Sequence, residues 1–404
     1  MRERVFITGI GVVSAIGTNF IHYGEGLRAG RSGAAPISAF DASAVPGGLG
    51  CEVRDFSPAE HFNRRQLVRM DRCTQFALVA AREAVAQAAV TPGVIDPLRI
   101  GVYLGTTLGG MINGTHYYQH LADTGHFKAS ALWDYPLFSA GAHVASEFGL
   151  RGPNLAYSTA CSSSNVAIGS AADMIRAGRL DAALAGGVDT MAKITVAGFN
   201  AMRNVSREAI RPFDRDRTGL VLGEGAAILV LESESSCRRR GALPLAEMLG
   251  YGMSNDAYHM TAPDATGRGP ALSMTRALKQ AGLGPDDITY INAHGTGTKH
   301  NDDTESRAIR KVFGERADAI PVSSTKSMHG HALGATGALE AAAIIAGMQG
   351  GYVPPTINYV TPDPKCDLDY VPNTARPHTI TAALSNNFGF GGNNCSIVLG
   401  RYAA

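Results

Sequence analysis

The chain contains an internal repeat of mixed helix and strand segments, and this duplication narrows the folds open to it. Residues 81–107 suggest an Ala-rich helix, a turn and a strand ending in Gly-Thr-Thr, and residues 275–298 repeat that order. A second pair, residues 157–175 and 323–345, joins a strand end to a helix of small residues. The repeat predicts two similar halves, residues 1–240 and 241–404, with the boundary near CRRRGALP.

Short runs of Val, Ile and Leu alternate with helical segments along the whole chain. The strand-like runs include residues 4–13, 99–107, 180–190, 226–233, 288–297 and 395–402. This alternation is typical of an α/β protein whose helices cover a central sheet. With 404 residues, the chain is long enough to bury a large core.

Charge and cysteine usage exclude several classes of protein. Lys and Arg total 36 against 35 Asp and Glu, so the chain has no bulk charge for binding nucleic acid or a membrane surface. No apolar run reaches the roughly 20 residues of a bilayer span, and Gly and Thr interrupt the apolar N-terminus, so we expect a buried strand there instead of a signal peptide. Six cysteines without a CxxC pair favour reduced thiols and a cytoplasmic location.

Reactive side chains gather in four short stretches at predicted strand ends, where α/β folds place their sites. The stretches are STAC (158–161), NAHGTGT (292–298), STKSMHGH (324–331) and NNFGFGG (386–392). The last is not a dinucleotide-binding fingerprint, because the GxGxxG spacing is absent. Its glycines instead predict a mobile or closely approached loop that presents backbone N–H groups.

Cys161 lies between a predicted strand and a predicted helix of small residues. At a helix N-terminus, unpaired N–H groups and the helix dipole would lower the thiol pKa and favour a nucleophilic thiolate. The alternative is a packed, inert thiol. Gly169 inside the helix costs roughly 1 kcal/mol of helix propensity, which is tolerable where other segments must approach closely.

Three histidines extend the candidate site. His294 precedes Gly and Thr residues that allow close approach and offer hydroxyls, as a site lining would. His329 and His331 raise the question of a metal, but no nearby Cys or Glu completes a tetrahedral set, and a helix beginning there would separate the rings. We therefore expect no metal.

The four motifs, in this order and over nearly the whole chain, resemble the β-ketoacyl-acyl carrier protein synthases. The resemblance implies the thiolase fold, a five-layered αβαβα arrangement of two duplicated halves. It also implies an acyltransferase without its own cofactor, whose substrates ride on the phosphopantetheine arm of an acyl carrier protein. Such enzymes are usually homodimers or heterodimers with a homologous chain-length factor.

The resemblance assigns a role to each matching residue. Cys161 would hold the acyl chain, and His294 and His331 would stabilise the enolate formed as malonyl-carrier protein loses carbon dioxide. The condensation would give a β-ketoacyl chain two carbons longer. The N–H groups of Cys161 and Phe390 would form the oxyanion hole, and Lys326, paired with Glu340, would order the site. Thr296 and Thr298 would bind the phosphopantetheine arm, and Phe388 would contact the substrate. Phe390 would gate the acyl pocket, and Leu108 would limit the length of the acyl chain. His329 stays outside this set.

Carrier proteins are acidic, so a basic docking surface is expected, and Arg64, Arg65 and Arg69 are the candidates. A solvated helix face is the alternative for these arginines.

A thiolase would use a second cysteine in place of His331, and a non-catalytic chain-length factor would lack Cys161. The segments 294–305 and 363–372 depart from housekeeping fatty acid synthases and resemble those of polyketide, polyene and nodulation-factor systems, so specialised metabolism is favoured over primary elongation.

Overall fold

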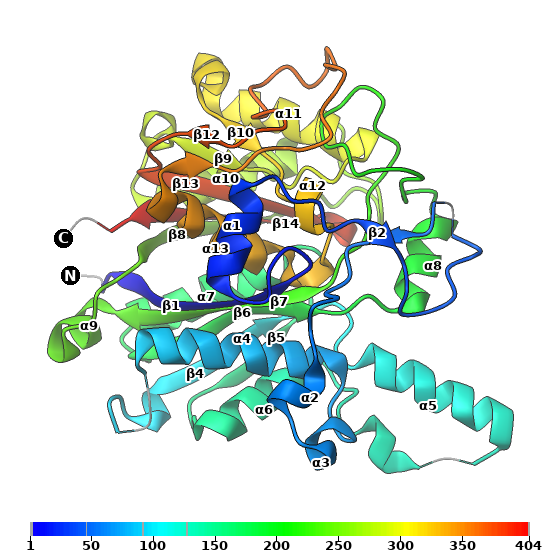
Figure 1. Cartoon of the computed structure of the whole chain (residues 1–404). Coiled ribbons are helices and arrows are strands. Elements are labelled where there is room, and N and C mark those ends of the chain that lie inside the picture. Colours follow the sequence, from blue (N-terminus) through cyan, green and yellow to red (C-terminus); the bar gives the residue numbers. More distant parts are fainter. Residues whose placement is uncertain (1–2, 46, 91–92, 127, 403–404) are drawn as a thin grey trace.

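A computed structural model describes residues 3–45, 47–90, 93–126 and 128–402. Ten strands form one hydrogen-bonded sheet in the order β10-β9-β13-β14-β8-β1-β7-β6-β4-β5 (Figure 1). They are β1 (Val5–Ser14), β4 (Ile100–Gly105), β5 (Asn154–Tyr157), β6 (Ala182–Asp189), β7 (Gly225–Ser233), β8 (Ala246–Asn255), β9 (Tyr290–Asn292), β10 (Val322–Ser323), β13 (Ala382–Gly389) and β14 (Asn393–Arg401). Two short ribbons stand apart, β2 (Ala35–Pro36) with β3 (Leu49–Gly50) and β11 (Tyr352–Val353) with β12 (Arg376–Pro377).

The strand order confirms the predicted duplication. In each half, the sheet runs third, second, fourth, fifth and first strand in chain order, as β5-β4-β6-β7-β1 and as β10-β9-β13-β14-β8. The two first strands, β1 and β8, join the halves through the pairs Phe6 with Glu247 and Ile7 with Ala246. The proposed division at residue 240 falls at the end of α9 (Glu234–Arg240), just before β8.

Helices complete the five layers of the predicted thiolase fold. In Figure 1, α4 and α6 cover the outer face of the first half, α10 and α11 cover that of the second, and α7 and α13 lie between the halves. The helices are α1 (Phe20–Arg28), α2 (Pro58–His61), α3 (Arg64–Leu67), α4 (Arg72–Ala88), α5 (Met111–Thr124), α6 (Ser139–Phe148), α7 (Ser163–Arg176), α8 (Lys193–Ala201), α10 (Arg268–Ala281), α11 (Lys299–Phe313), α12 (Lys326–His329) and α13 (Thr336–Gly350). Within the described ranges, none of them has both the length and the apolar character needed to cross a bilayer.

Small residues allow the central helices to be buried between the halves. A Cβ at Gly169 of α7 would lie 2.3 Å from the ring of Tyr251 on β8, and one at Gly337 of α13 would lie 2.4 Å from the side chain of Asn165. A Cβ at Gly105, at the end of β4, would lie 2.3 Å from the backbone N of Ser164. The helix-propensity loss at Gly169 is therefore offset by close packing across the molecule.

Candidate active site

Cys161 lies in a bend between β5 and α7, at the junction of the two halves. The residue before it, Ala160, has a φ of +53°, a left-handed conformation that costs an ordinary residue roughly 1 kcal/mol or more. The helix itself begins at Ser163, so Cys161 precedes it by two residues. The side chain is buried, with 7% of the residue exposed, yet it lines two cavities.

The electrostatic environment of Cys161 differs from the one we expected. Burial raises the pKa of the thiol to about 12, so the prediction of a lowered pKa is wrong for the free protein. Opposing this, the charge of Lys326 and the backbone N–H groups of Phe390 and Cys161 lower the pKa, because each favours a negative sulfur. Cys161 therefore rests as a thiol, beside groups that stabilise negative charge once it forms.

Two imidazoles stand beside the thiol. The rings of His294 and His331 meet edge to face with centroids 5.4 Å apart, and their nearest nitrogens and the sulfur of Cys161 all lie within 4.8 Å of one another. Burial, followed by the charge of Lys326, holds the pKa of each histidine well below its ordinary value. Both rings are therefore neutral at pH 7.

Backbone geometry fixes the tautomer of His331. The N–H of Leu333 donates to His331 Nδ1 over 3.1 Å, so that nitrogen carries the lone pair and Nε2 carries the proton. An Nε2–H group can donate to a developing oxyanion. Metal binding by the same nitrogen would require the opposite tautomer and would leave the Leu333 N–H unpaired, so the donor set fits oxyanion stabilisation better than a metal.

We expect the side chains of His294 and His331 to stay neutral from pH 8 down to pH 5.5, because their pKa values are lowered. His143 provides an internal contrast, since its contact with Asp134 raises its pKa. In spectra of the protein carrying labelled histidine, the ring signals of His294 and His331, assigned with single Gln variants, should not move over this range. The His143 signal should titrate above pH 6.5. Titration of either active-site ring near pH 6.5 would contradict the assignment.

Lys326 and Glu340 form a fully buried ion pair beneath the histidines. The Lys326 ammonium donates to the carboxylate of Glu340, which also accepts from the side-chain amide of Asn387. His329, at the end of α12, lines neither cavity beside Cys161, and its Nε2 lies 3.1 Å from Thr325 Oγ1. Its ring lies instead against Tyr23, with ring centroids 6.1 Å apart.

Two cavities meet at the thiol. The larger one, of about 440 Å³, holds His294, His331, Thr296, Thr298 and Phe388 in its lining. The smaller one, of about 310 Å³, is almost wholly apolar, and Leu108, Leu333 and Met111 line it. Phe390 borders both cavities together with Phe199, with the two rings stacked 5.5 Å apart. The geometry suits a polar entrance and an apolar chamber with an aromatic pair between them.

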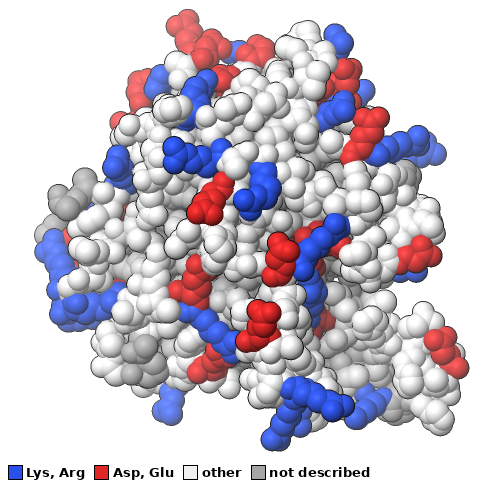
Figure 2. Space-filling model, viewed as in Figure 1, with Lys and Arg blue, Asp and Glu red and all other residues white. Residues whose placement is uncertain are grey.

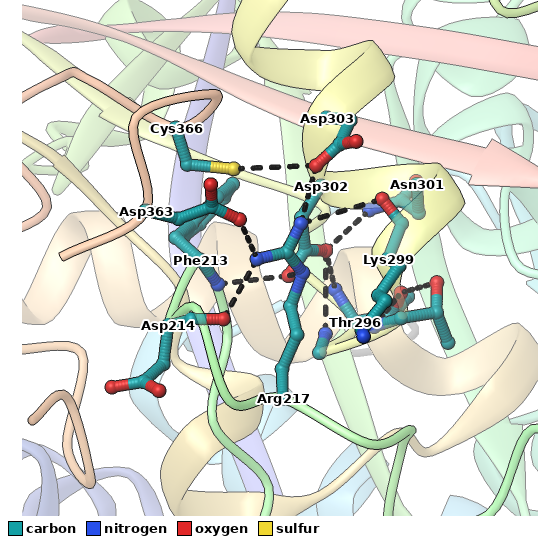
Figure 3. A network of polar contacts seen from close by, with 12 residues as sticks. Phe213, Asp214, Arg217, Thr296, Lys299, Asn301, Asp302, Asp303, Asp363 and Cys366 are labelled. Atoms are coloured by element: carbon teal, nitrogen blue, oxygen red, sulfur yellow. Dashed lines mark hydrogen bonds and ion pairs between the residues drawn. The ribbon is translucent and has the colours of Figure 1, made fainter. Parts of the chain in front are cut away.

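A buried carboxylate shapes the loop that carries Thr296 and Thr298. Asp302 accepts from the backbone N–H of Thr296 at 3.1 Å, and its other oxygen accepts from that of Phe213 at 2.8 Å. Figure 3 shows the guanidinium of Arg217 reaching from the first half to the carboxylates of Asp302, Asp303 and Asp363. The Arg217 side chain is 1% exposed. The two threonine hydroxyls lie 2.8 Å apart on the wall of the polar cavity.

Comparison with protein families settles the relationship. The model described as "Beta-ketoacyl synthase, N-terminal domain" matches residues 2–236, and its C-terminal counterpart matches residues 245–360. The chain belongs to the β-ketoacyl synthase family. The predicted resemblance is therefore confirmed.

Individual β-ketoacyl synthases match over their full length. The chain is 41% identical to a 3-oxoacyl-[acyl-carrier-protein] synthase 2 of Synechocystis, with 99% of each chain covered. It is 42% identical to nodulation protein E of Rhizobium meliloti, with 98% of each covered. Among solved structures, the ishigamide ketosynthase/chain length factor superimposes with a TM-score of 0.95 at 39% identity, covering 100% of both chains. A type II polyketide ketosynthase in complex with its acyl-carrier protein reaches 0.92 at 34% identity, again covering 100% of both chains.

The candidate docking arginines of this β-ketoacyl synthase lie far from its central layers. Arg64 and Arg65 belong to α3 and Arg69 follows it, and all three are exposed. Figure 2 shows blue side chains projecting along the lower edge of the molecule, where Figure 1 places α3. Arg69 also lies over the ring of Trp133, 5.8 Å from its centroid.

Some site residues carry no signal in the sequence. Phe199 is one apolar residue in an ordinary amphipathic helix, and only the fold brings it against Phe390. Glu305 accepts from the backbone N–H groups of His294 and Gly295, each at 2.8 Å, and so holds the turn that presents the histidine. Nothing in its position on α11 marks this role in the sequence.

Proposed function

We propose that this β-ketoacyl synthase condenses an acyl chain held on Cys161 with a malonyl unit held on an acyl carrier protein. The observation that carries the proposal is the meeting of a thiol and two neutral imidazoles within 4.8 Å, between a polar and an apolar cavity. The relatives named as acyl-carrier-protein synthases and ketosynthases support the same reaction.

In the first step, Cys161 attacks the thioester of an acyl-carrier protein and releases the carrier thiol. A neutral imidazole at this distance can take the thiol proton and return it to the leaving sulfur. The N–H groups of Cys161 and Phe390, which already favour negative charge at the sulfur, would hold the tetrahedral oxyanion. The apolar cavity beyond Phe390 would take the acyl chain, with Leu108 in its wall.

In the second step, malonyl-carrier protein enters through the polar cavity and loses carbon dioxide. The Nε2–H of His331, with His294 beside it, would donate to the enolate oxygen that forms. The enolate carbon then bonds to the carbonyl carbon of the Cys161 thioester, and the sulfur departs and regains a proton. Thr296 and Thr298 would bind the phosphopantetheine arm, so the reaction needs no cofactor of the protein's own.

A chain-length factor is the second candidate function, because one of the similar structures pairs a ketosynthase with such a factor. The presence of Cys161, His294 and His331 in one constellation favours the catalytic role.

A copy of this chain or a homologous factor would be the partner subunit of the protein. The edge strand of the sheet, β5, with Leu155 44% exposed, suits such an interface.

Carrier docking at α3 predicts a salt-sensitive loss of affinity. In the Arg65→Glu, Arg69→Glu double variant, KM for malonyl-carrier protein should rise about tenfold at low salt, because an acidic partner then meets like charge. The difference should shrink at high salt while kcat stays near the wild-type value. Arg238→Glu on α9, which lies at the left edge of Figure 1 and apart from α3, is the matched control. Unchanged kinetics in the double variant would favour a plain solvated helix face.

The pathway is decided by product analysis. The protein would be incubated with malonyl-carrier protein and saturated and unsaturated acyl primers of several lengths, and the products identified by mass. We expect β-ketoacyl products two carbons longer, with unsaturated primers preferred if the role is in specialised metabolism. Primary fatty acid elongation would show instead as equal use of saturated primers. Failure to extend any primer, alone or with a chain-length factor, would overturn the catalytic proposal.

A cytoplasmic location completes the proposal. All six cysteines are free thiols, as expected of a protein in a reducing compartment.

A further inference from the structure

Asp189, at the end of β6, is a fully buried carboxylate without a role in the reaction described above. One oxygen accepts from Thr106 Oγ1 at 2.8 Å and from the backbone N–H of Leu108 at 2.9 Å. The other accepts from the N–H of Thr107 at 2.8 Å and from the N–H of Gly334 at 2.7 Å. Four donors thus converge on one side chain.

The contacts that offset the burial of this charge are hydrogen bonds. Burial raises the pKa of Asp189 to about 6, and the donors from Leu108, Thr107, Thr106 and Gly334 oppose that shift. The group is thus ionised at pH 7, and as a carboxylate it presents acceptors alone to all four donors. Burying an anion costs free energy unless hydrogen bonds compensate for it. Here the carboxylate accepts four hydrogen bonds, which an apolar side chain could not do.

The first of the two segments held by Asp189, residues 106–108, lies at the apolar cavity. Thr107 and Leu108 line that cavity directly, and both give their N–H groups to the carboxylate. Thr106 also accepts from the N–H of Gly109 at 3.0 Å, which closes the turn before α5. The position of the Leu108 side chain in the cavity wall therefore depends on Asp189.

The second segment comes from the other half of the chain. Leu333 lines the same cavity with a φ of +50°, a strained conformation, and the next residue, Gly334, is tied to Asp189. A Cβ at Gly334 would lie 2.6 Å from the carboxylate oxygen, so the contact leaves no room for a side chain. The same strained residue donates its N–H to His331.

We propose that Asp189 is a positioning residue that sets the two walls of the acyl cavity, and with them the chain length that Cys161 accepts. It clamps the Leu108 turn from one half against the Leu333 turn from the other, and Cys161 lies between them. This inference rests on the proposed function, because it assumes that the apolar cavity takes the acyl chain.

The test is the Asp189→Asn variant, which keeps the size of the side chain. An amide nitrogen must then face one of the two pairs of N–H or O–H donors, so the Leu108 turn loses at least one anchor in either orientation, and in one of them the Leu333 turn loses its anchor as well. Acylation of Cys161 would be followed by intact mass with a short and a long acyl-carrier protein. The ratio of the two acylation rates should change at least tenfold from wild type. Partial unfolding would scale both rates equally and leave the ratio alone.

Two further variants guard this test. Glu232→Gln removes another buried carboxylate. Glu232 lies on β7 and pairs with Ala182, at the end of β6 opposite to Asp189, so this variant should leave the ratio unchanged. Thr106→Val removes one of the four donors without changing the carboxylate, so it should change the ratio by less than Asp189→Asn does. It provides the test if Asp189→Asn does not fold. A ratio within twofold of wild type in either folded variant, Asp189→Asn or Thr106→Val, overturns the inference. Absence of any acylation in the wild-type protein would instead refute the proposed function.

Discussion

Cys161→Ala is expected to abolish acyl transfer and condensation, with a loss of at least about 10³-fold, because it removes the thiol that lines both cavities and would carry the acyl chain. Incubation of the wild-type protein with acyl-carrier protein should add the mass of one acyl group, and the variant should show no adduct. The fold should persist, since alanine removes only one sulfur from a residue in a bend.

The variant also separates the two steps. Because the histidines remain, Cys161→Ala should still release carbon dioxide from malonyl-carrier protein. Cys395→Ala is the matched control: Cys395 is also a buried thiol, but it lies on β14 in the core. It should keep both the adduct and the product. An adduct that persists in Cys161→Ala and disappears in Cys395→Ala would show that Cys161 is not the nucleophile.

His331→Ala is expected to lower decarboxylation of malonyl-carrier protein by about 10²–10³-fold, the usual effect of removing one oxyanion donor. The neutral ring with its proton on Nε2 is the donor that this variant lacks. Acylation of Cys161 should fall far less, because the N–H groups of Cys161 and Phe390 are untouched. Carbon dioxide release and adduct formation are measured separately on the same preparation.

His329→Gln provides the neighbouring control for that experiment. His329 is equally buried, and burial likewise lowers its pKa, to about 3, but its ring bonds to Thr325 and lines neither cavity at the thiol. This variant should decarboxylate at nearly the wild-type rate. Wild-type release of carbon dioxide by His331→Ala would remove His331 from the mechanism, and a severe loss in His329→Gln would show a role that its orientation does not explain.

The sequence was most informative where chemistry and repetition coincide. The duplicated helix and strand segments predicted two equivalent halves, and the reactive side chains at predicted strand ends predicted where a site would lie. Both follow from local patterns, because strand ends and small-residue helices are written in consecutive residues. The family resemblance supplied the meeting of Cys161, His294 and His331 and the order of the layers, which local patterns alone do not determine.

The rest depended on contacts between distant residues. The pKa of Cys161 was predicted in the wrong direction, because a helix N-terminus is visible in the sequence while complete burial is not. Phe199 and Asp189 were missed, since an apolar helix residue and a strand-end aspartate have no distinctive pattern. Phe199 meets Phe390, and Asp189 binds the N–H groups of Leu108 and Gly334, through contacts between residues that are remote in sequence.

The division of the site between two halves has a consequence during synthesis. Cys161 belongs to the half that leaves the ribosome first, whereas His294, Lys326, His331 and Phe390 all follow β8, the strand that joins the halves. A nascent chain therefore exposes its nucleophile before it has any group able to activate it. Catalytic competence arrives only with the last strands, so the thiol is kept idle until the fold is complete.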